Sequence, residues 1–192
     1  MWIEVIGLPG VGKTTMIEKN IVIIENNYKI IKSDKSKIFQ KIFTKIIYHF
    51  YFSLISNDKK LSQKLAYRYG FRLFKRKEEN LFFFDSGILQ VFLESLIEED
   101  FKNQDTVLKL RSKIPNSNKI IYLKDNLNDI VFREINRSCS RFNLSQKETL
   151  KRYKQAEEFI EKELLQHSDI IVTIRSNNDL EFEKALKSEK EF

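Results

Sequence analysis

The stretch that decides the fold of this chain is Gly7-Leu8-Pro9-Gly10-Val11-Gly12-Lys13-Thr14. Three of the five glycines and one of the two prolines of the whole chain fall between residues 7 and 12. Glycine permits unusual backbone dihedrals and lets an anion approach the chain closely. In the Walker A pattern G-x-x-x-x-G-K-[ST], backbone N–H groups surround a row of phosphates, the lysine reaches their oxygens and the hydroxyl ligates Mg²⁺. We therefore expect a phosphate-binding loop at residues 7–14.

The residues on either side of this loop have the pattern that it requires. Residues 2–6 are an apolar, β-branched run typical of a buried strand, and residues 15–25 continue as a helix without a breaker. The helix would add its unpaired N–H groups and positive dipole end to the site. The alternative is a glycine-rich turn that binds nothing. The residues expected to contact a nucleotide are Gly7, Pro9, Gly10, Val11, Gly12, Lys13, Thr14 and Thr15, and Thr14 is also expected to hold Mg²⁺.

Length and composition indicate one folded domain, residues 1–192. The chain is 42% hydrophobic and 32% charged, which is too apolar for a disordered chain and sufficient for a full core. A single cysteine, Cys139, excludes an intrachain disulfide and favours a cytoplasmic location. We expect no secretory signal and no membrane span, because polar residues interrupt the apolar stretch 38–55. The formal charge of +7 suits an anionic partner, either a phosphorylated small molecule or a nucleic acid.

Four further strands are predicted, at residues 28–32, 81–84, 119–123 and 169–174. The last three are continuous apolar runs, as expected for parallel strands covered on both faces. Helical segments separate them, which indicates repeated βαβ units with right-handed crossovers. In such α/β sheets, ligands gather at the carboxyl ends of the strands.

Residues 35–77 are expected to form a helical cover over the site of a second ligand, the acceptor. Apolar pairs recur every four residues from 38 to 55, and a second helix runs from about 61 to 77. The alternative for its aromatic residues is plain packing onto the sheet, and a third interpretation places the first helix on a membrane surface. Candidate contacts in this cover are Tyr48, Tyr51, Tyr67, Arg68 and Arg72.

These features in this order resemble the P-loop kinase superfamily, with the outline of nucleoside and nucleotide kinases such as thymidylate kinase. The resemblance implies a three-layer α/β sandwich with a five-stranded parallel sheet of order 2-3-1-4-5, flanking helices and a helical lid. It implies ATP and Mg²⁺ as cofactors, and transfer of the γ-phosphoryl group to a nucleoside, a nucleotide or another hydroxyl compound such as a sugar. It also allows a homodimer. The chain has Asp85-Ser86 in place of an Asp-Arg pair and lacks a Glu-Arg-Ser element, which leaves the acceptor open.

Two carboxylates are candidates for the chemistry. Asp85 ends the apolar run 81–84, the Walker B pattern, and is expected to hold Mg²⁺ near Thr14 or to orient the acceptor hydroxyl. The alternative for Asp85 is an N-cap of the helix that begins near Gly87. Asp34 follows the second strand, where the resemblance implies a residue that contacts the acceptor or acts as the base; a helix N-cap is the alternative.

After the fourth strand, arginines recur every four residues at the place where the resemblance implies a lid, residues 133–145. They are Arg133, Arg137 and Arg141. The spacing places Arg133 and Arg137 on one helix face, and always-charged planar donors suit the phosphoryl group being transferred. Arg137 is also expected to contact the nucleotide, and the resemblance implies that residues 175–178 pass the adenine base. The alternative is a solvated helix face.

Other classes of nucleotide-binding protein fit less well. A GTPase switch needs Asn-Lys-x-Asp, but the one Asn-Lys pair, at residues 118–119, is followed two positions later by Ile121. A nucleic-acid-acting P-loop NTPase stays open as the alternative function, although residues 75–77 are the only short basic run. A non-catalytic nucleotide-binding module would not require the intact Lys13-Thr14 pair.

Overall fold

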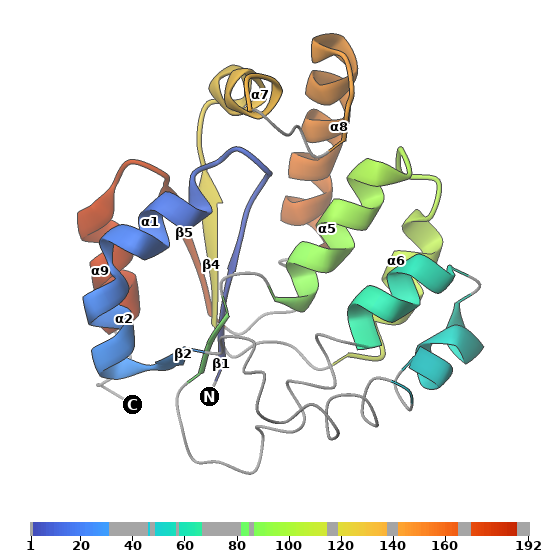
Figure 1. Ribbon diagram of the computed structural model, residues 1–192, viewed down its shortest axis with the longest axis horizontal. Coiled ribbons are helices and arrows are strands. Elements are labelled where there is room, and N and C mark those ends of the chain that lie inside the picture. The colour runs from blue at the N-terminus through green and yellow to red at the C-terminus, as the bar shows by residue number, and fades with distance from the viewer. Residues whose placement is uncertain are drawn as a thin grey trace.

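A computed structural model describes most of the chain. The described residues are 2–30, 46, 49–56, 58–66, 82–84, 87–114, 119–137, 142–164 and 170–187. They form one parallel sheet with helices on both of its faces (Figure 1). The α/β class expected from the sequence is confirmed.

The strands of this sheet follow the order β2-β3-β1-β4-β5, which is the order implied by the resemblance. Every neighbouring pair is parallel, so all strands end at the same edge of the sheet. The strand β1 lies in the middle, between β3 and β4, and its residues Ile3, Val5 and Ile6 are buried, as expected for a strand covered on both faces. The bounds of the strands are Trp2–Ile6 for β1, Lys29–Ile30 for β2, Phe82–Phe84 for β3, Lys119–Lys124 for β4 and Ile170–Arg175 for β5.

Helices cover the sheet in two groups, with α7 above the strand ends (Figure 1). One face carries α1 (Lys13–Lys19), α2 (Ile21–Asn27) and α9 (Asp179–Lys187). The other face carries α5 (Ile88–Glu98), α6 (Gln104–Arg111) and α8 (Gln146–Phe159), which continues into the π-helical turn η2 (Ile160–Leu164). The helix α7 spans Leu127–Ile135.

The helix after the phosphate loop is two helices, so the prediction of one continuous helix is wrong. The break falls at Asn20, whose backbone has φ −102° and ψ 13°. The Asn20 side chain donates a hydrogen bond of 3.0 Å to the carbonyl of Met16. An amide side chain that bonds the backbone of its own last turn competes with continuation of the helix.

The start of α8 is fixed by a reciprocal cap. Ser145 Oγ accepts a hydrogen bond from the Glu148 N–H at 3.3 Å, and Glu148 Oε2 accepts one from the Ser145 N–H at 3.2 Å. Such a capping box satisfies two of the unpaired donors at a helix start. The capping box therefore fixes Gln146 as the first residue of α8.

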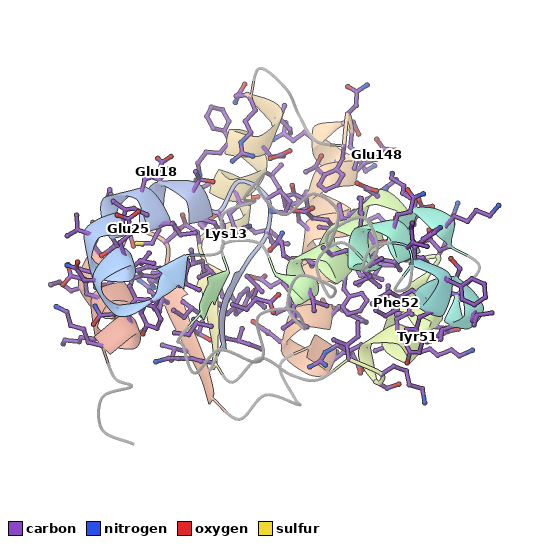
Figure 2. The ribbon with its side chains drawn as sticks, turned by 60° about the horizontal axis from the view of Figure 1, so that its bottom comes forward. Lys13, Glu18, Glu25, Tyr51, Phe52 and Glu148 are labelled. Atoms are coloured by element: carbon purple, nitrogen blue, oxygen red, sulfur yellow. The ribbon has the colours of Figure 1, made fainter. Side chains whose placement is uncertain are left out.

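The predicted helical cover is described in part. Residues 49–55 and 59–66 are helical, and Phe52, Leu61 and Leu65 are buried. Tyr51 lies on the outer side of its helix with 41% of its surface exposed, next to the buried ring of Phe52 (Figure 2). Tyr51 therefore contributes to the surface rather than to the packing of the core. The other four candidate contacts, Tyr48, Tyr67, Arg68 and Arg72, lie outside the described residues. No helix in the described part of the chain has the length and apolarity needed to cross a membrane.

Candidate functional site

The phosphate loop leaves the middle of the sheet at the end of β1 and enters α1 at Lys13. Gly12 is the N-cap of α1 with φ +99°, and Gly10 has φ +91°, a region that favours glycine. A Cβ added to Gly10 would lie 2.7 Å from the carbonyl oxygen of Ile130 in α7. The glycines therefore let the loop take this shape while it packs tightly beneath α7.

Lys13 points back into this loop. Its Nζ donates to the carbonyl oxygens of Gly7 at 2.6 Å and Leu8 at 3.3 Å. Figure 2 shows the residue at the start of α1. The ammonium therefore lies at the loop that would hold a polyphosphate, and two carbonyls of that loop are among its partners.

The first turn of α1 has the chemistry expected of an anion and magnesium site. It contains no acidic residue, and the side chains of Thr14 and Thr15 are exposed. Within the described ranges, no group of three or more His, Cys, Asp or Glu could hold a metal. Mg²⁺ in phosphate sites usually needs only one or two protein oxygen ligands besides the phosphates and water. Thr14 fits such a ligand set, while its expected partner Asp85 lies outside the described residues.

Gln90 is a member of the site that the sequence analysis missed. Its Oε1 accepts a hydrogen bond of 3.2 Å from the N–H of Gly7, and its Nε2 donates to Glu94 at 3.1 Å. The side chain is fully buried in α5. One polar residue inside the apolar run 88–93 was the available signal, because a buried amide needs partners.

Glu4 in β1 is a second buried polar residue that the sequence analysis missed. Its Oε1 accepts a hydrogen bond of 2.6 Å from the N–H of Leu89, in the first turn of α5. The N-cap of α5 is Gly87, which has no side chain to cap the helix. Glu4 supplies a carboxylate to this helix start from the neighbouring strand β1 instead. The N-cap position itself is taken by Gly87, and Asp85 lies outside the described residues. A Cβ on Gly87 would lie 2.2 Å from Cδ of Glu4, so a larger residue there would have to displace the Glu4 side chain.

Asp125 joins the lid side of the site to the end of β5. Its Oδ2 accepts hydrogen bonds from Arg133 Nη2 and, at 2.6 Å, from Ser176 Oγ. Its Oδ1 accepts one of 2.8 Å from the N–H of Asn126. Partial burial alone would raise the pKa of Asp125, but these bonds and the charge of Arg133 outweigh it and lower that pKa. The carboxylate is therefore ionised at neutral pH.

The predicted lid arginines are not on one helix face. Arg133 lies on α7, whereas α7 ends at Ile135 and Arg137 comes two residues later. The end is fixed by Asn136, whose side chain donates to the carbonyl of Phe132 at 2.9 Å. Arg137 turns to the buried carboxylate of Glu134, with 3.2 Å between Nη1 and Oε2.

The structure brings together only part of the predicted site. Arg133 lies beside the phosphate loop, since its Nη1 is 4.0 Å from the place of a Cβ on Gly12. Ser176, in the segment expected to pass the adenine base, borders the same glycine at 3.9 Å. Asp34, Asp85 and Arg141 lie outside the described residues.

Comparisons with known proteins identify the fold. No protein-family model matches the chain, and no curated protein sequence matches it significantly. Among solved structures, deoxyadenosine kinase from M. mycoides with bound dATP has a TM-score of 0.60 and 17% identity, covering 99% of this chain and 98% of that chain. The same values hold for that enzyme with dCMP and a flexible dCDP bound, and the form with bound dCTP gives 0.53 and 15%. At this level of identity, the likeness shows that the chain has the fold of P-loop nucleoside kinases.

Proposed function

We propose that this protein is an ATP-dependent kinase that transfers the γ-phosphoryl group of ATP to a hydroxyl group of a nucleoside. The observation that carries the proposal is the complete phosphate loop, with Lys13 turned into it, at the end of the central strand of this fold. The similar enzymes are deoxyadenosine kinases with dATP, dCTP, dCMP or dCDP bound. Deoxynucleosides are therefore the acceptors to test first, with ribonucleosides, nucleoside monophosphates and sugars after them.

In the proposed reaction the loop and Lys13 bind the phosphates of ATP. Backbone N–H groups of the loop would contact the phosphates, and the Lys13 ammonium would exchange the Gly7 and Leu8 carbonyls for phosphate oxygens. This exchange replaces dipole contacts by charge pairing, which strengthens as charge develops on the transferring group. Bound Mg²⁺ would neutralise further phosphate charge, held by Thr14 and Asp85.

The remaining roles in this proposal belong to acidic and basic residues around the loop. Arg133 donates to the phosphates from the α7 side. Arg137 and Arg141 belong to a lid, formed by residues 133–145, that excludes water from the site. Asp34 or Asp85 orients the acceptor hydroxyl and takes its proton.

The test is acceptor-dependent release of ADP from Mg²⁺-ATP. Deoxynucleosides should stimulate ADP release and appear as monophosphates by chromatography. Release stimulated only by DNA or RNA, with no phosphorylated product, would instead support the nucleic-acid-acting alternative.

Replacement of Lys13 by Ala should lower kcat by a factor of about 10²–10³, the usual loss when one preorganised donor to the transition state is removed. The matched control is Lys19→Ala at the other end of α1, where the lysine pairs with exposed Asp179 at 3.1 Å. That variant should keep wild-type turnover. Equal activity of Lys13→Ala and wild type would show that the loop does not perform this chemistry.

A further inference from the structure

The Asp125 carboxylate ties together three segments at the carboxyl edge of the sheet. It directly follows β4, and its two side-chain partners are Ser176, which follows β5, and Arg133 on α7. Because Lys124 is opposite Arg175 in the parallel pair β4–β5, residues 125 and 176 leave the sheet side by side. The Ser176 N–H adds a bond of 3.0 Å to the Lys124 carbonyl. Asp125 thus lies at a fixed point of the fold rather than on a loose turn.

Both partners of Asp125 border the entrance to α1. From the place of a Cβ on Gly12, Ser176 Cβ is 3.9 Å away and Arg133 Nη1 is 4.0 Å away. Gly12 is the last glycine of the phosphate loop and the N-cap of α1. The side chains that Asp125 holds therefore flank the loop where it turns into the helix.

The guanidinium of Arg133 is fixed from two sides. Asp125 accepts from Nη2, and the Asp129 carbonyl accepts from Nε at 3.1 Å. The nitrogen that lies nearest Gly12 is Nη1. A free arginine loses much rotamer freedom when it binds a ligand, and a side chain that is already oriented avoids most of that loss.

We propose that Asp125 is a positioning residue, which holds Arg133 at the phosphate loop so that the arginine meets the phosphates of a bound nucleotide already oriented. Through Ser176 the same carboxylate fixes the first residue after β5. The inference rests on the proposed function, because it assumes that the loop binds a nucleoside triphosphate.

The opposite role would be competition, in which Asp125 withholds Arg133 from the nucleotide. The two roles predict opposite changes in nucleotide affinity when Asp125 is replaced. Loss of a positioning carboxylate weakens nucleotide binding, whereas loss of a competing one strengthens it. Asn is the suitable replacement, since it keeps the shape of Asp125 but loses the charge and presents an N–H₂ group to at least one of its donors.

The experiment is a double-mutant cycle of Asp125→Asn and Arg133→Gln. Affinity for Mg²⁺-ADP is measured by calorimetry, and kcat and KM for ATP are measured with a deoxynucleoside acceptor. Asp125→Asn should raise the Kd of ADP and the KM of ATP about tenfold, the usual loss for a charge-assisted hydrogen bond at a partly exposed site. In the Arg133→Gln background the same change should have almost no effect, because Asp125 acts through Arg133.

Matched controls separate this role from general damage. Glu161→Gln removes a neighbouring ion pair, the 2.6 Å contact with Lys124 beside Asp125, and should leave Kd and KM unchanged. Should Asp125→Asn lack a cooperative melting transition, Asp125→Glu replaces it in the same cycle. Its longer side chain displaces the guanidinium, so weaker binding that disappears in the Arg133→Gln background is again expected.

The outcomes distinguish failure of the positioning role of Asp125 from failure of the proposed function on which it rests. Wild-type protein that binds no Mg²⁺-ADP refutes the proposed function. Wild-type protein that binds it, together with an Asp125→Asn variant that binds as well or more tightly, overturns the positioning role alone. Equal losses in the wild-type and Arg133→Gln backgrounds would also overturn it, because Asp125 would then act by another route.

Discussion

Gln90 holds the phosphate loop to α5 through one buried amide. It accepts from the N–H of Gly7, and the carbonyl of Gly7 in turn accepts from Lys13. Gly7, whose carbonyl accepts from Lys13, is thus itself held to α5 by Gln90. A buried N–H that loses its acceptor keeps the full cost of desolvation.

We predict that Gln90→Leu lowers the free energy of unfolding by about 1–3 kcal/mol, the cost of an unsatisfied buried donor. The KM for ATP should rise as well, because the anchor of Lys13 loosens. Urea denaturation measures the first effect and steady-state kinetics the second. Gln155→Leu, on the exposed side of α8, is the control and should change stability by less than about 0.5 kcal/mol. Identical urea denaturation curves for Gln90→Leu and wild type would show that the hydrogen bond between Gly7 and Gln90 does not stabilise the fold.

The sequence was informative for individual residues where a short motif sets the chemistry. Lys13 lies in the phosphate loop because the motif fixes its distance along the chain from Gly7. It was not informative for Gln90 and Glu4, whose partners Gly7 and Leu89 are 83 and 85 residues away in the chain. Those roles depend on which segments the sheet brings together, and local spacing does not contain that information.

At the level of helices, Glu98 connects the helical cover to α5. Lys60 Nζ lies 2.7 Å and Lys64 Nζ 3.0 Å from its carboxylate oxygens. Burial alone would raise the pKa of Glu98, but hydrogen bonds from the two lysines outweigh it and lower that pKa below 4.5. The cluster therefore stabilises the folded protein only while the carboxylate is ionised.

We predict that Glu98→Gln lowers stability by about 0.5–1 kcal/mol at neutral pH, as expected for a small, partly exposed ion-pair network. Because the folded-state pKa is depressed, this contribution is fully present above the ordinary pKa of 4.5 and is lost as the pH falls through the folded-state pKa. Thermal melts of both proteins from pH 7 to pH 3 should therefore converge at the acidic end. Glu18→Gln, at an exposed position on α1, serves as control and should change stability by less than about 0.5 kcal/mol (Figure 2). A difference in melting temperature between wild type and Glu98→Gln that persists at pH 3 would show that the variant loses packing rather than charge interactions.

Helix ends were the least predictable elements, and asparagine explains three of them. The side-chain amides of Asn20, Asn27 and Asn136 each donate to the carbonyl four residues earlier, at 3.0, 2.7 and 2.9 Å. They terminate α1, α2 and α7. Apolar periodicity continues through such residues, so the pattern alone predicted one helix where α1 and α2 are separate, and a shared face for Arg133 and Arg137. The strands were easier, since long apolar runs between helices leave little choice of pairing.

For the whole molecule, the net charge of +7 gives a prediction about substrates. A positive protein attracts a polyanion over distances of about one Debye length, roughly 10 Å at 0.1 M salt, and salt screens this attraction. The KM for ATP should therefore rise several-fold between about 0.05 M and about 0.5 M ionic strength, a range over which the Debye length falls severalfold. The KM for an uncharged deoxynucleoside should stay nearly constant in the same assays. Equal changes in both constants would indicate a general effect of salt on the enzyme rather than attraction of the nucleotide.

The contact between Glu4 and Gly87 constrains how related chains can diverge. Any side chain at position 87 would collide with the Glu4 carboxyl group, 2.2 Å from the nearest added atom. A larger residue at position 87 would therefore displace the Glu4 carboxylate and remove the acceptor of the Leu89 N–H, unless position 4 also shortens and α5 obtains another acceptor. Substitutions at positions 4 and 87 should therefore be coupled, although 82 other residues lie between them in the chain.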